Sequence, residues 1–363
     1  MNKIQKMIHD LCPNGVEWKT LGEVCTTIIA PKKLDKKYYL PKGLYPIIDQ
    51  GQKYIIAYTN DEEALLPSAE YVLFGDHTRE IKYVDFAFAQ GADGVKILQA
   101  DTDILPKYLY YAMSNLQIPS RGYNRHWSIA KDLSIPIPPL PVQVEIVNLL
   151  DKFTQLSAEL KAELKLRRKQ YDYYRNHLLS FDSNSTTVHW MPLGEVAELK
   201  AGKSISATQI FETQSALHKY PCFGGNGIRG YVDSFSHHGE FPIIGRQGAL
   251  CGCVNYANGD FYATEHAVVA KPKGEVLNRF LFYMLQNADL NQYKTQGAQP
   301  GLSVTKLNEI VFPIPPMEEQ ERIVGILDKF ETLVNDLSKG LPAEIALVQK
   351  QYEYYRNMLL TFE

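Results

Sequence analysis

The 363-residue chain has few of the features that mark membrane, secreted or metal-binding proteins. No stretch approaches the ~20 consecutive apolar residues that a membrane-spanning helix requires. The first six residues contain no apolar segment of the kind found in signal peptides, so a cytoplasmic location is expected. The cysteines form an odd, scattered set without paired zinc-ligand spacing: Cys12, Cys25, Cys222, Cys251 and Cys253. We expect structural thiols rather than disulfides or metal ligands.

Catalytic motifs are also lacking. The chain contains no Asn/Asp-Pro-Pro-aromatic loop, which an amino-methyltransferase of DNA needs to grip its base. Gly202-Lys203-Ser204 resembles the end of a phosphate-binding loop, but Ala197 stands where the motif requires its first glycine. Two triplets with the spacing of some nucleases have no convincing aspartate before them: Glu80-Ile81-Lys82 and Glu198-Leu199-Lys200. Two histidine-containing pairs have no evident third metal ligand: His237-His238 and Glu265-His266. We therefore expect no catalytic residue and no metal site.

An excess of positive charge is lacking as well. The formal net charge is −3, and residues 1–140 and 183–316 each hold as many acidic as basic side chains. This balance argues against a protein that coats nucleic acid by bulk electrostatics. A DNA-binding protein of this composition must gather its basic residues on one face or rely on a partner for phosphate contacts.

An internal repeat is the strongest pattern in the sequence. Four blocks return in the same order: Val16–Val24 at Val188–Val196, Pro136–Pro139 at Pro313–Pro316, Leu150–Phe153 at Leu327–Phe330, and Gln170–Asn176 at Gln351–Asn357. The period is far longer than that of a solenoid repeat, so the chain is interpreted as a duplicated domain followed by a helix. Copy one spans residues 1–182 and copy two spans residues 183–363.

The repeat predicts four segments. Residues 1–140 and 183–316 form a first and a second globular domain, whereas 141–182 and 317–363 form helices. Within the domains, stretches 25–135 and 197–312 have almost no similarity. Either their loops drifted neutrally, or one scaffold carries two binding specificities, and we favour the second interpretation. Glycine and proline punctuation predicts mixed α/β domains with short strands, in an α+β chain with a pseudo-two-fold repeat.

The helical segments have the heptad spacing of a coiled coil. Each has one narrow apolar seam, so we expect the two helices to pair with each other, in antiparallel fashion. The seam residues of copy one are Ile146, Phe153, Leu160 and, after a four-residue stutter, Tyr171 and Tyr174. Those of copy two are Ile323, Phe330, Leu337, Tyr352 and Tyr355. Ser338–Pro342 adds four residues in copy two, and Pro342 should interrupt or kink the helix. The insertion either shifts the two domains relative to each other or is simply tolerated.

These blocks carry a resemblance to a known family. The paired Leu-Gly-Glu-Val entries, the Pro-Ile-Pro-Pro exits and the helix openings at Gln143–Val147 and Glu319–Val324 resemble specificity subunits of type I restriction-modification systems. Val142 departs from the family's usual glutamate at that position. The resemblance implies two target-recognition domains, each reading half of an interrupted DNA site. It also implies helices that act as a ruler and dock two methyltransferase subunits, with restriction subunits joining. S-adenosylmethionine, ATP and magnesium would then belong to the partners.

Basic and amide side chains are the candidates for DNA contact. Lysines of the first domain suit phosphates: Lys32, Lys33, Lys36 and Lys37. A second group suits base edges: Arg121, Tyr123, Asn124 and Arg125, followed by Lys131. The alternative is a solvated loop above packed aromatic residues. The second domain offers Lys294, Gln296, Gln299, Ser303 and Lys306, and the glycine-flanked Asn226, Arg229, Arg246 and Gln247. Arg246 and Gln247 could equally form a tight turn with a structural arginine.

Three other functions remain open. One is the recognition subunit of a related restriction-modification class, in which methylation and cleavage reside in a single partner. Another is a nuclease that uses one of the Glu-x-Lys triplets. The third is a structural coiled-coil scaffold without a role in nucleic-acid binding.

Overall fold

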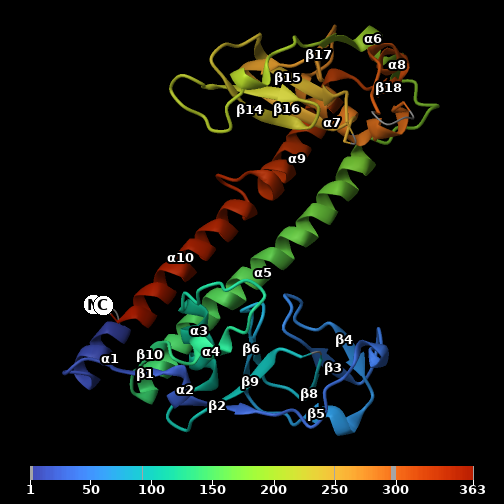
Figure 1. Cartoon of the computed structure of the whole chain (residues 1–363). Coiled ribbons are helices and arrows are strands. Elements are labelled where there is room, and N and C mark those ends of the chain that lie inside the picture. Colours follow the sequence, from blue (N-terminus) through green and yellow to red (C-terminus); the bar gives the residue numbers. More distant parts are fainter. Residues whose placement is uncertain (1–2, 92, 249, 296–299, 363) are drawn as a thin grey trace. The chain divides into compact units, whose positions relative to one another are not determined.

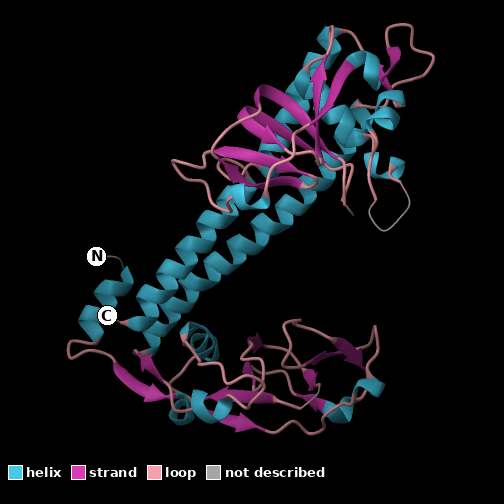
Figure 2. Cartoon of the chain, turned by 45° about the horizontal axis from the view of Figure 1, so that its top comes forward, coloured by secondary structure: helices cyan, strands magenta, loops and turns pink. Residues whose placement is uncertain are grey.

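The computed structural model describes residues 3–91, 93–248, 250–295 and 300–362. The chain forms two compact units: the first combines Met1–Lys161 with Glu344–Glu363, and the second is Ala162–Ala343. Each unit therefore holds one globular domain together with helical segments from both copies of the repeat. Strands lie in the globular domains, and the long helical segments follow them in sequence (Figures 1 and 2).

The first domain is built from short strands. These are β1 (Glu17–Thr20), β2 (Cys25–Ile28), β3 (Tyr45–Ile48), β4 (Ala57–Thr59), β5 (Leu65–Leu66), β6 (Tyr71–Gly75), β7 (Ile81–Val84), β8 (Phe88–Gln90), β9 (Val95–Ala100) and β10 (Ser134–Ile137). One sheet has the order β2-β9-β6-β7, a second has β4-β3-β8-β5, and β1 pairs with β10. All five residues of β6 are buried, as expected of an apolar strand in the middle of a sheet.

Short helices complete this domain. They are α1 (Lys3–Leu11), α2 (Leu21–Val24), η1 (Lys36–Tyr38), η2 (Glu62–Ala64), α3 (Pro106–Asn115) and α4 (Trp127–Ala130). Helix α3 begins with proline, which suits a first helical turn because its missing N–H would be unpaired there anyway. It buries Tyr108, Leu109 and Met113 in the core of the first unit, together with Val72 and Phe74 of β6.

The second domain repeats this plan with longer strands. Its strands are β11 (His189–Pro192), β12 (Ala197–Ala201), β13 (Tyr220–Gly224), β14 (Gly227–Val232), β15 (His237–Gly245), β16 (Val254–Ala263), β17 (Ala267–Pro272) and β18 (Val311–Ile314). Its short helices are α6 (Leu193–Val196), η3 (Ala207–Gln209), α7 (Asn278–Asn287), η4 (Leu290–Tyr293) and α8 (Val304–Glu309). One sheet has the order β12-β17-β15-β16-β13-β14, and β11 pairs with β18.

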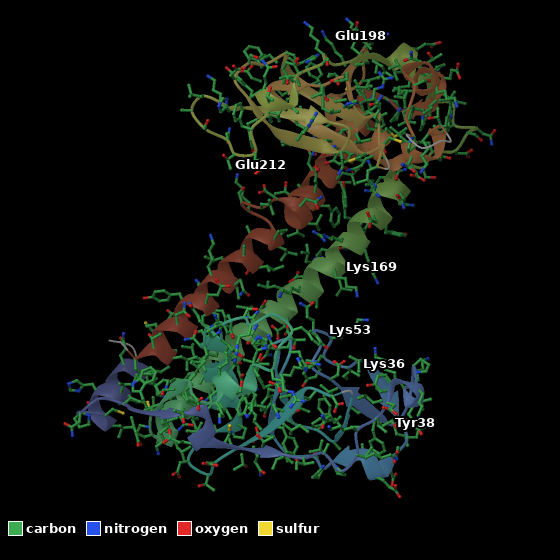
Figure 3. All side chains as sticks on the ribbon, viewed as in Figure 1. Lys36, Tyr38, Lys53, Lys169, Glu198 and Glu212 are labelled. Carbon is green, nitrogen blue, oxygen red and sulfur yellow. The ribbon has the colours of Figure 1, made fainter. Side chains whose placement is uncertain are left out.

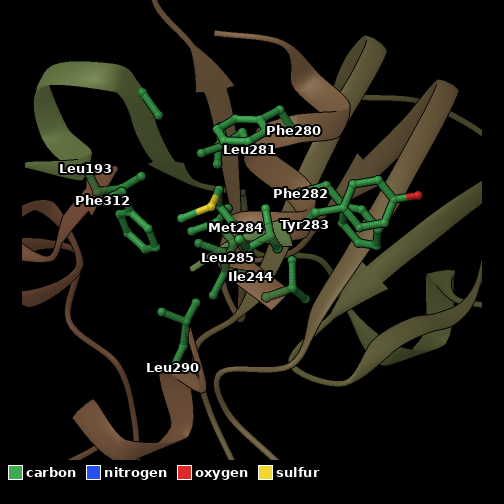
Figure 4. Packing of buried hydrophobic residues seen from close by; sticks show 14 of the residues in the cluster. Leu193, Ile244, Phe280, Leu281, Phe282, Tyr283, Met284, Leu285, Leu290 and Phe312 are labelled. Atoms are coloured by element: carbon green, nitrogen blue, oxygen red, sulfur yellow. The ribbon is translucent and has the colours of Figure 1, made fainter. Parts of the chain in front are cut away.

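The core of the second unit lies around α7. Residues Phe280 to Leu285 of this helix are all buried, and they pack with Ile244, Leu193 and Phe312 (Figure 4). Helix α7 is therefore enclosed by Ile244 of the sheet strand β15 and by Leu193 and Phe312, which belong to the segments that enter and leave the domain.

The repeated blocks meet in space within each copy. Trp18 of β1 lies opposite Pro136 of β10, and Trp190 of β11 lies opposite Pro313 of β18. The entry and exit blocks thus form one antiparallel two-stranded sheet at the base of each domain.

Strands β3 and β8 run parallel, as do β13 and β16. The predicted α+β fold class, an internal repeat of an α/β domain and a long helix, is confirmed.

Three long helices follow the domains. They are α5 (Leu140–Leu178), α9 (Met317–Asn335) and α10 (Leu341–Thr361). In the first unit α10 lies beside the first part of α5, running in the opposite direction, and Phe153 stacks on Tyr355 with ring centroids 5.4 Å apart (Figure 1). In the second unit the end of α5 lies beside α9, and Tyr174 stacks on Phe330 with ring centroids 5.3 Å apart.

Among the described residues, no helix is long and apolar enough to cross a membrane.

Burial along the helices follows the apolar seam only in part. Ile146 and Ile323 are fully buried, and Leu160 and Tyr171 nearly so. The prediction for Leu337 is wrong: it lies in the turn between α9 and α10 and is 83% exposed. The helix ends before it, at Asn335, and restarts at Leu341. The seam pattern assumed a continuous helix through this point.

The break between α9 and α10 has a local cause. The carboxylate of Asp336 accepts hydrogen bonds from the main-chain N–H groups of Ser338 and Lys339, which closes a turn. A Cβ on Gly340 would lie 2.3 Å from the carbonyl oxygen of Thr332, so only glycine fits there. Pro342 then lies in the first turn of α10, where its missing N–H costs nothing.

All five cysteines are free, and three of them, Cys25, Cys222 and Cys251, are buried. Burial raises the pKa of Cys25 to about 12 and that of Cys222 to about 11. Thiol reagents attack the thiolate, which at pH 8 would be roughly one part in ten thousand of Cys25. The partly exposed Cys12 and Cys253 should therefore react first.

We predict that a chromogenic thiol reagent at pH 8 titrates two cysteines of the native chain quickly and the other three only after denaturation. Mass spectrometry of the labelled peptides identifies the sites. Rapid labelling of Cys25 or Cys222 in the native chain would contradict the burial described here.

Candidate nucleic-acid interface

In the first domain, three loops are joined by side-chain hydrogen bonds. Gln50 follows β3, and its Oε1 accepts from the main-chain N–H of His77, in the turn after β6 (3.1 Å). Its Nε2 donates to the carbonyl oxygen of Asp93, before β9 (3.0 Å). The hydroxyl of Thr78 donates to the carbonyl oxygen of Gln50 (2.5 Å). One amide side chain thus fixes the relative positions of three strand ends.

The loop before α4 is attached to the same turn by a buried histidine. His126 is 1% exposed, and its Nε2 accepts from the main-chain N–H of Arg121 (3.0 Å). Its Nδ1 must then carry the proton and donate to the carbonyl oxygen of Asp76 (2.9 Å). The Asp76 carboxylate accepts from the N–H of Trp127 (2.7 Å). Because both ring nitrogens are used, this histidine shapes the loop and is not available to a ligand.

The candidate base-reading residues lie on this anchored loop. Arg121, Tyr123 and Arg125 are exposed, and the ring of Tyr123, 84% exposed, stacks on His77 at 4.6 Å. Asn124 donates to the carbonyl oxygen of Arg121 (2.5 Å). Lys131 is also exposed, but its carbonyl oxygen accepts from the N–H of Gly22 at the base of the domain. The structure therefore places the Arg121–Arg125 loop beside His77, whereas Lys131 lies at the base of the domain.

The lysine run is held by carboxylates of its own domain. The ammonium of Lys32 contacts Asp61 at 2.6 Å, and that of Lys33 contacts Asp93 at 2.6 Å. The lysines lower the pKa of both aspartates through these hydrogen bonds, and Arg125 adds a smaller effect at Asp93. Lys33 and Arg125 therefore face one carboxylate near the three joined loops. Lys36 and Lys37 lie on η1 at the domain's edge, where Figure 3 shows Lys36 and Tyr38. Such exposed ion pairs are weak and can open for a phosphate.

The second domain has an open pocket at the corresponding strand ends. The pocket has a volume of about 500 Å³ and is lined by Asn226, Ile228, Arg229, Gln247 and Leu250 together with four glycines. Close backbone packing forms its wall, because a Cβ on Gly245 would lie 1.9 Å from the carbonyl oxygen of Gly225. Arg229, Gln247 and Asn226 are exposed, so they present a guanidinium and two amides around a shallow hollow.

The main chain of Arg246 joins two segments beside this pocket. Its N–H donates to the carbonyl oxygen of His266 (2.9 Å), and its own carbonyl oxygen accepts from Leu302 (2.8 Å). Gln247 pairs with Gly301 in an isolated β-bridge. The segment before α8 is thus attached to the end of β15, as the Arg121–His126 loop is attached to the end of β6. The residue is only partly exposed, and the buried Nε of its side chain has no hydrogen-bond partner among the described residues.

The remaining candidates of the second domain lie around α8. Ser303 caps this helix, and its hydroxyl accepts from the N–H of Lys306 (3.1 Å). Lys294 donates to the side chain of Asn291 (2.8 Å). Lys294 and Lys306 line one hollow of about 550 Å³, with Glu309 on its rim. Gln296 and Gln299 lie outside the described residues.

The two Glu-x-Lys triplets lie in different surroundings. Lys82 is 6% exposed, and its ammonium donates to the carbonyl oxygens of Asp49 (2.8 Å) and Lys53 (2.6 Å). Burial lowers its pKa. Glu198 and Lys200 pair with each other at 2.6 Å on β12. In the part of the chain that the structure describes, no three His, Cys, Asp or Glu side chains gather as metal ligands would.

Sequence reasoning missed Gln50 and His77. The repeat holds only a weak signal for them: Leu73-Phe74-Gly75 corresponds to Ile243-Ile244-Gly245, which places His77 opposite Gln247. Similarly, Tyr45-Pro46 corresponds to Tyr220-Pro221, which places Gln50 beside the glycine turn before Asn226. Two matching residues are too few to recognise without the paired strands.

Comparison with known proteins identifies this architecture. The family model of the type I restriction modification DNA specificity domain matches residues 13–166 and again residues 187–347. The chain therefore belongs to the family of specificity subunits of type I restriction-modification systems.

Two curated relatives and one solved structure agree. The chain is 34% identical to the type I restriction enzyme EcoR124I/EcoR124II specificity subunit of Escherichia coli, over 100% of this chain and 97% of that subunit. It is 50% identical to the EcoprrI specificity subunit of Escherichia coli, over 56% of this chain and 52% of that subunit. The S subunit of the type I restriction-modification system from M. genitalium has a similar fold, with a TM-score of 0.68 at 18% identity, covering 96% of this chain and 97% of that one.

We predict that His126→Phe loosens the Arg121–Arg125 loop without unfolding the domain. The substitution keeps a buried ring but leaves the Arg121 N–H unpaired, at a cost of about 1–3 kcal/mol. Limited trypsin digestion should cleave after Arg121 and Arg125 faster than in the unmodified chain. Lys131→Ala, which removes an exposed side chain just beyond the loop and leaves the main-chain contact of that residue, is the control. Equal cleavage rates for His126→Phe and the unmodified chain would show that the histidine does not hold the loop.

Proposed function

We propose that this chain is the non-catalytic recognition subunit of a type I restriction-modification complex. Each domain reads one half of an interrupted DNA site and directs methyltransferase and restriction subunits to it. The observation that carries the proposal is the contrast between the two copies. The sheet at the base of each domain is alike, whereas the loops at the strand ends present different side chains. Copy one offers His77, Tyr123 and Arg125, and copy two offers Asn226, Arg229 and Gln247.

The chemistry of these side chains suits base reading. Arginine bonds the O6 and N7 of guanine in bidentate fashion, and asparagine or glutamine bonds the N6 and N7 of adenine. The lysines at the edges of both domains suit phosphates, which position a protein without specifying sequence. With a net charge of −3, the chain needs basic surface from its partners to bind DNA tightly. S-adenosylmethionine, ATP and magnesium are assigned to those partners.

A test of this function changes one half-site at a time. Arg125→Ala should relax the base preference of one half of the methylated sequence, and Arg229→Ala that of the other half. A lost bidentate contact is worth about 1–3 kcal/mol of discrimination, or roughly 5- to 150-fold. The measurement is methylome sequencing of cells that express each variant together with the methyltransferase subunit.

Lys294→Ala is the control, because loss of a phosphate contact weakens binding at all sites equally. A methylome unchanged by deletion of this chain would exclude the proposed function. Cleavage of DNA by the purified chain with magnesium would favour a nuclease instead.

The helices carry a second observation that concerns the partners. Five exposed side chains near the end of each copy match: four pairs are identical, and the fifth pairs an aspartate with a glutamate. This shared stripe comprises Leu166, Lys169, Asp172, Tyr173 and Asn176 in copy one, and Leu347, Lys350, Glu353, Tyr354 and Asn357 in copy two. Tyr173 is 63% exposed and Tyr354 is 64% exposed. Figure 3 shows Lys169 projecting from α5.

The spacing of the shared stripe places its residues on one face of each helix, because residues three, four and seven apart lie above one another. Exposed leucine and tyrosine in a matched pattern indicate a protein contact rather than solvation. Since the same stripe occurs twice, its occupants are two copies of one partner. The assignment is two methyltransferase subunits, one for each stripe.

We predict that Tyr173→Ala and Tyr354→Ala each weaken the binding of one methyltransferase subunit by tenfold or more, and that the double variant loses both. Exposed tyrosines that anchor an interface commonly contribute more than about 1 kcal/mol. Native mass spectrometry of the co-purified complex counts the bound subunits. Leu337→Ala removes an exposed apolar side chain that lies outside the shared stripe, and this variant should bind two subunits. Two tightly bound subunits on the double variant would contradict the assignment.

A further inference from the structure

Two fully buried glutamines occupy equivalent positions where each domain meets its helix. Gln143 lies in the first turn of α5 and Gln320 in the first turn of α9, and both are 0% exposed. Glutamine is rarely enclosed so completely, because each unpaired polar atom would cost free energy. Their contacts explain how both amides are accommodated.

The side chain of Gln143 makes three hydrogen bonds with two segments of the first domain. Its Oε1 accepts from the N–H of Leu105, which precedes α3 (2.9 Å). Its Nε2 donates to the carbonyl oxygens of Asp103 (3.0 Å) and Pro138 (2.8 Å). The amide therefore joins the start of α3, the exit of β10 and the first turn of α5.

Gln320 repeats these contacts in the second domain. Its Oε1 accepts from the N–H of Leu277 (3.0 Å), and its Nε2 donates to the carbonyl oxygens of Glu275 (2.9 Å) and Pro315 (2.9 Å). We call each set of three bonds a glutamine clamp. Every partner atom in both clamps belongs to the main chain. The clamps are thus alike although the domains they hold differ in sequence.

A second anchor lies eight residues further along each helix, or about 12 Å at 1.5 Å per residue. In copy one, Asp151 accepts from the hydroxyl of Tyr111 (2.6 Å) and pairs with Lys107 (2.8 Å). In copy two, Asp328 accepts from the hydroxyl of Tyr283 (2.5 Å) and pairs with Arg279 (2.6 Å). Buried apolar residues fill the space between clamp and anchor, among them Ile146 in copy one and Ile323 in copy two.

Two anchors at different heights determine the angle between a domain and its helix, whereas a single anchor would act as a pivot. Apolar packing alone holds surfaces together without fixing their direction, since it is not directional. A clamp made of three directed hydrogen bonds removes that freedom. From this geometry we infer that Gln143 and Gln320 are positioning residues that set the spacing between the two DNA half-sites. The inference rests on the proposed function.

The spacing of the half-sites is sensitive to small rotations. Successive base pairs are 3.4 Å apart along each strand. A domain that has lost its clamp can pivot about its second anchor, and a movement of its reading loops by one base-pair step is enough to change the spacing that is read. Loss of a clamp should therefore admit sites whose interruption is one base pair longer or shorter.

The experiment uses the full chain co-expressed with its methyltransferase subunits. The substrate is a plasmid set in which the two half-sites, read from the methylome of the unmodified system, are separated by the native interruption or by one base pair more or fewer. Gln143→Met and Gln320→Met remove all three hydrogen bonds and keep a side chain of similar length. The matched controls are Ile146→Val and Ile323→Val, which weaken the same joints without touching the clamps.

We expect the ratio of methylation rates, native spacing over altered spacing, to fall at least tenfold in each glutamine variant and to stay unchanged in the valine controls. An unchanged ratio in both methionine variants would overturn the inference, even if their melting temperatures fall. If a methionine variant does not fold, Gln143→Asn and Gln320→Asn, which shorten the amide, are compared in the same way. An unmodified complex that methylates no bipartite site would instead exclude the proposed function.

Hydrogen exchange provides a readout that is independent of methylation. Gln143→Met should speed exchange of the Leu105 amide and leave that of Leu277 unchanged, and Gln320→Met should do the reverse. Each domain is thus the internal control for the other. Equal protection of Leu105 in Gln143→Met and the unmodified chain would show that the clamp does not hold this segment.

Discussion

A long helix with one apolar stripe needs a second helix, and that need organises the whole chain. Helix α5 spans 39 residues, far more than its own domain can cover. Its first part is covered in the first unit by α10, and its end is covered in the second unit by α9. Each compact unit is therefore completed by a segment of the other copy. Neither copy of the repeat contains all the residues that its own unit requires.

This exchange explains why some blocks of the repeat are alike and others are not. The entry and exit blocks pair as a two-stranded sheet in each domain, and the tyrosine-rich block packs against the other copy's helix. The sequence of each of these segments is constrained by the strand or helix that it packs against. The exposed side chains of the strand-end loops do not pack in either core, so Arg125 and Tyr123 in one domain can be replaced by Arg229 and Gln247 in the other without harm to either core.

The sequence predicted the repeat, the domains followed by helices and the break in copy two, because each rests on local pattern or on comparison of the copies. It could not predict which charges are free. Lys32 and Lys33 are paired with aspartates 29 and 60 residues away, and only the folded sheet brings those carboxylates to them. Leu337 fits the heptad pattern but lies within the turn that Asp336 closes, so spacing alone gave the wrong answer.

Gln143 illustrates a different limit. A glutamine in the first turn of a helix is usually solvated, and nothing in its neighbourhood indicates burial. The sequence signal was its identity with Gln320 across the repeat, in a block where Ile146-Val147 also matches Ile323-Val324, and identity alone does not show burial. Its role depends on two main-chain segments that meet the helix only after the domain has folded.

Because the glutamine clamps bind only main-chain atoms, a domain needs no particular side chains to be held by them. Any domain with the same backbone at its entry and exit can be seated on the same helix. At the level of genes, recombination between the conserved blocks could replace one domain with an unrelated sequence in a single event. The product would keep its helices and its partners while acquiring a new half-site, so this joint favours rapid diversification of target sequence.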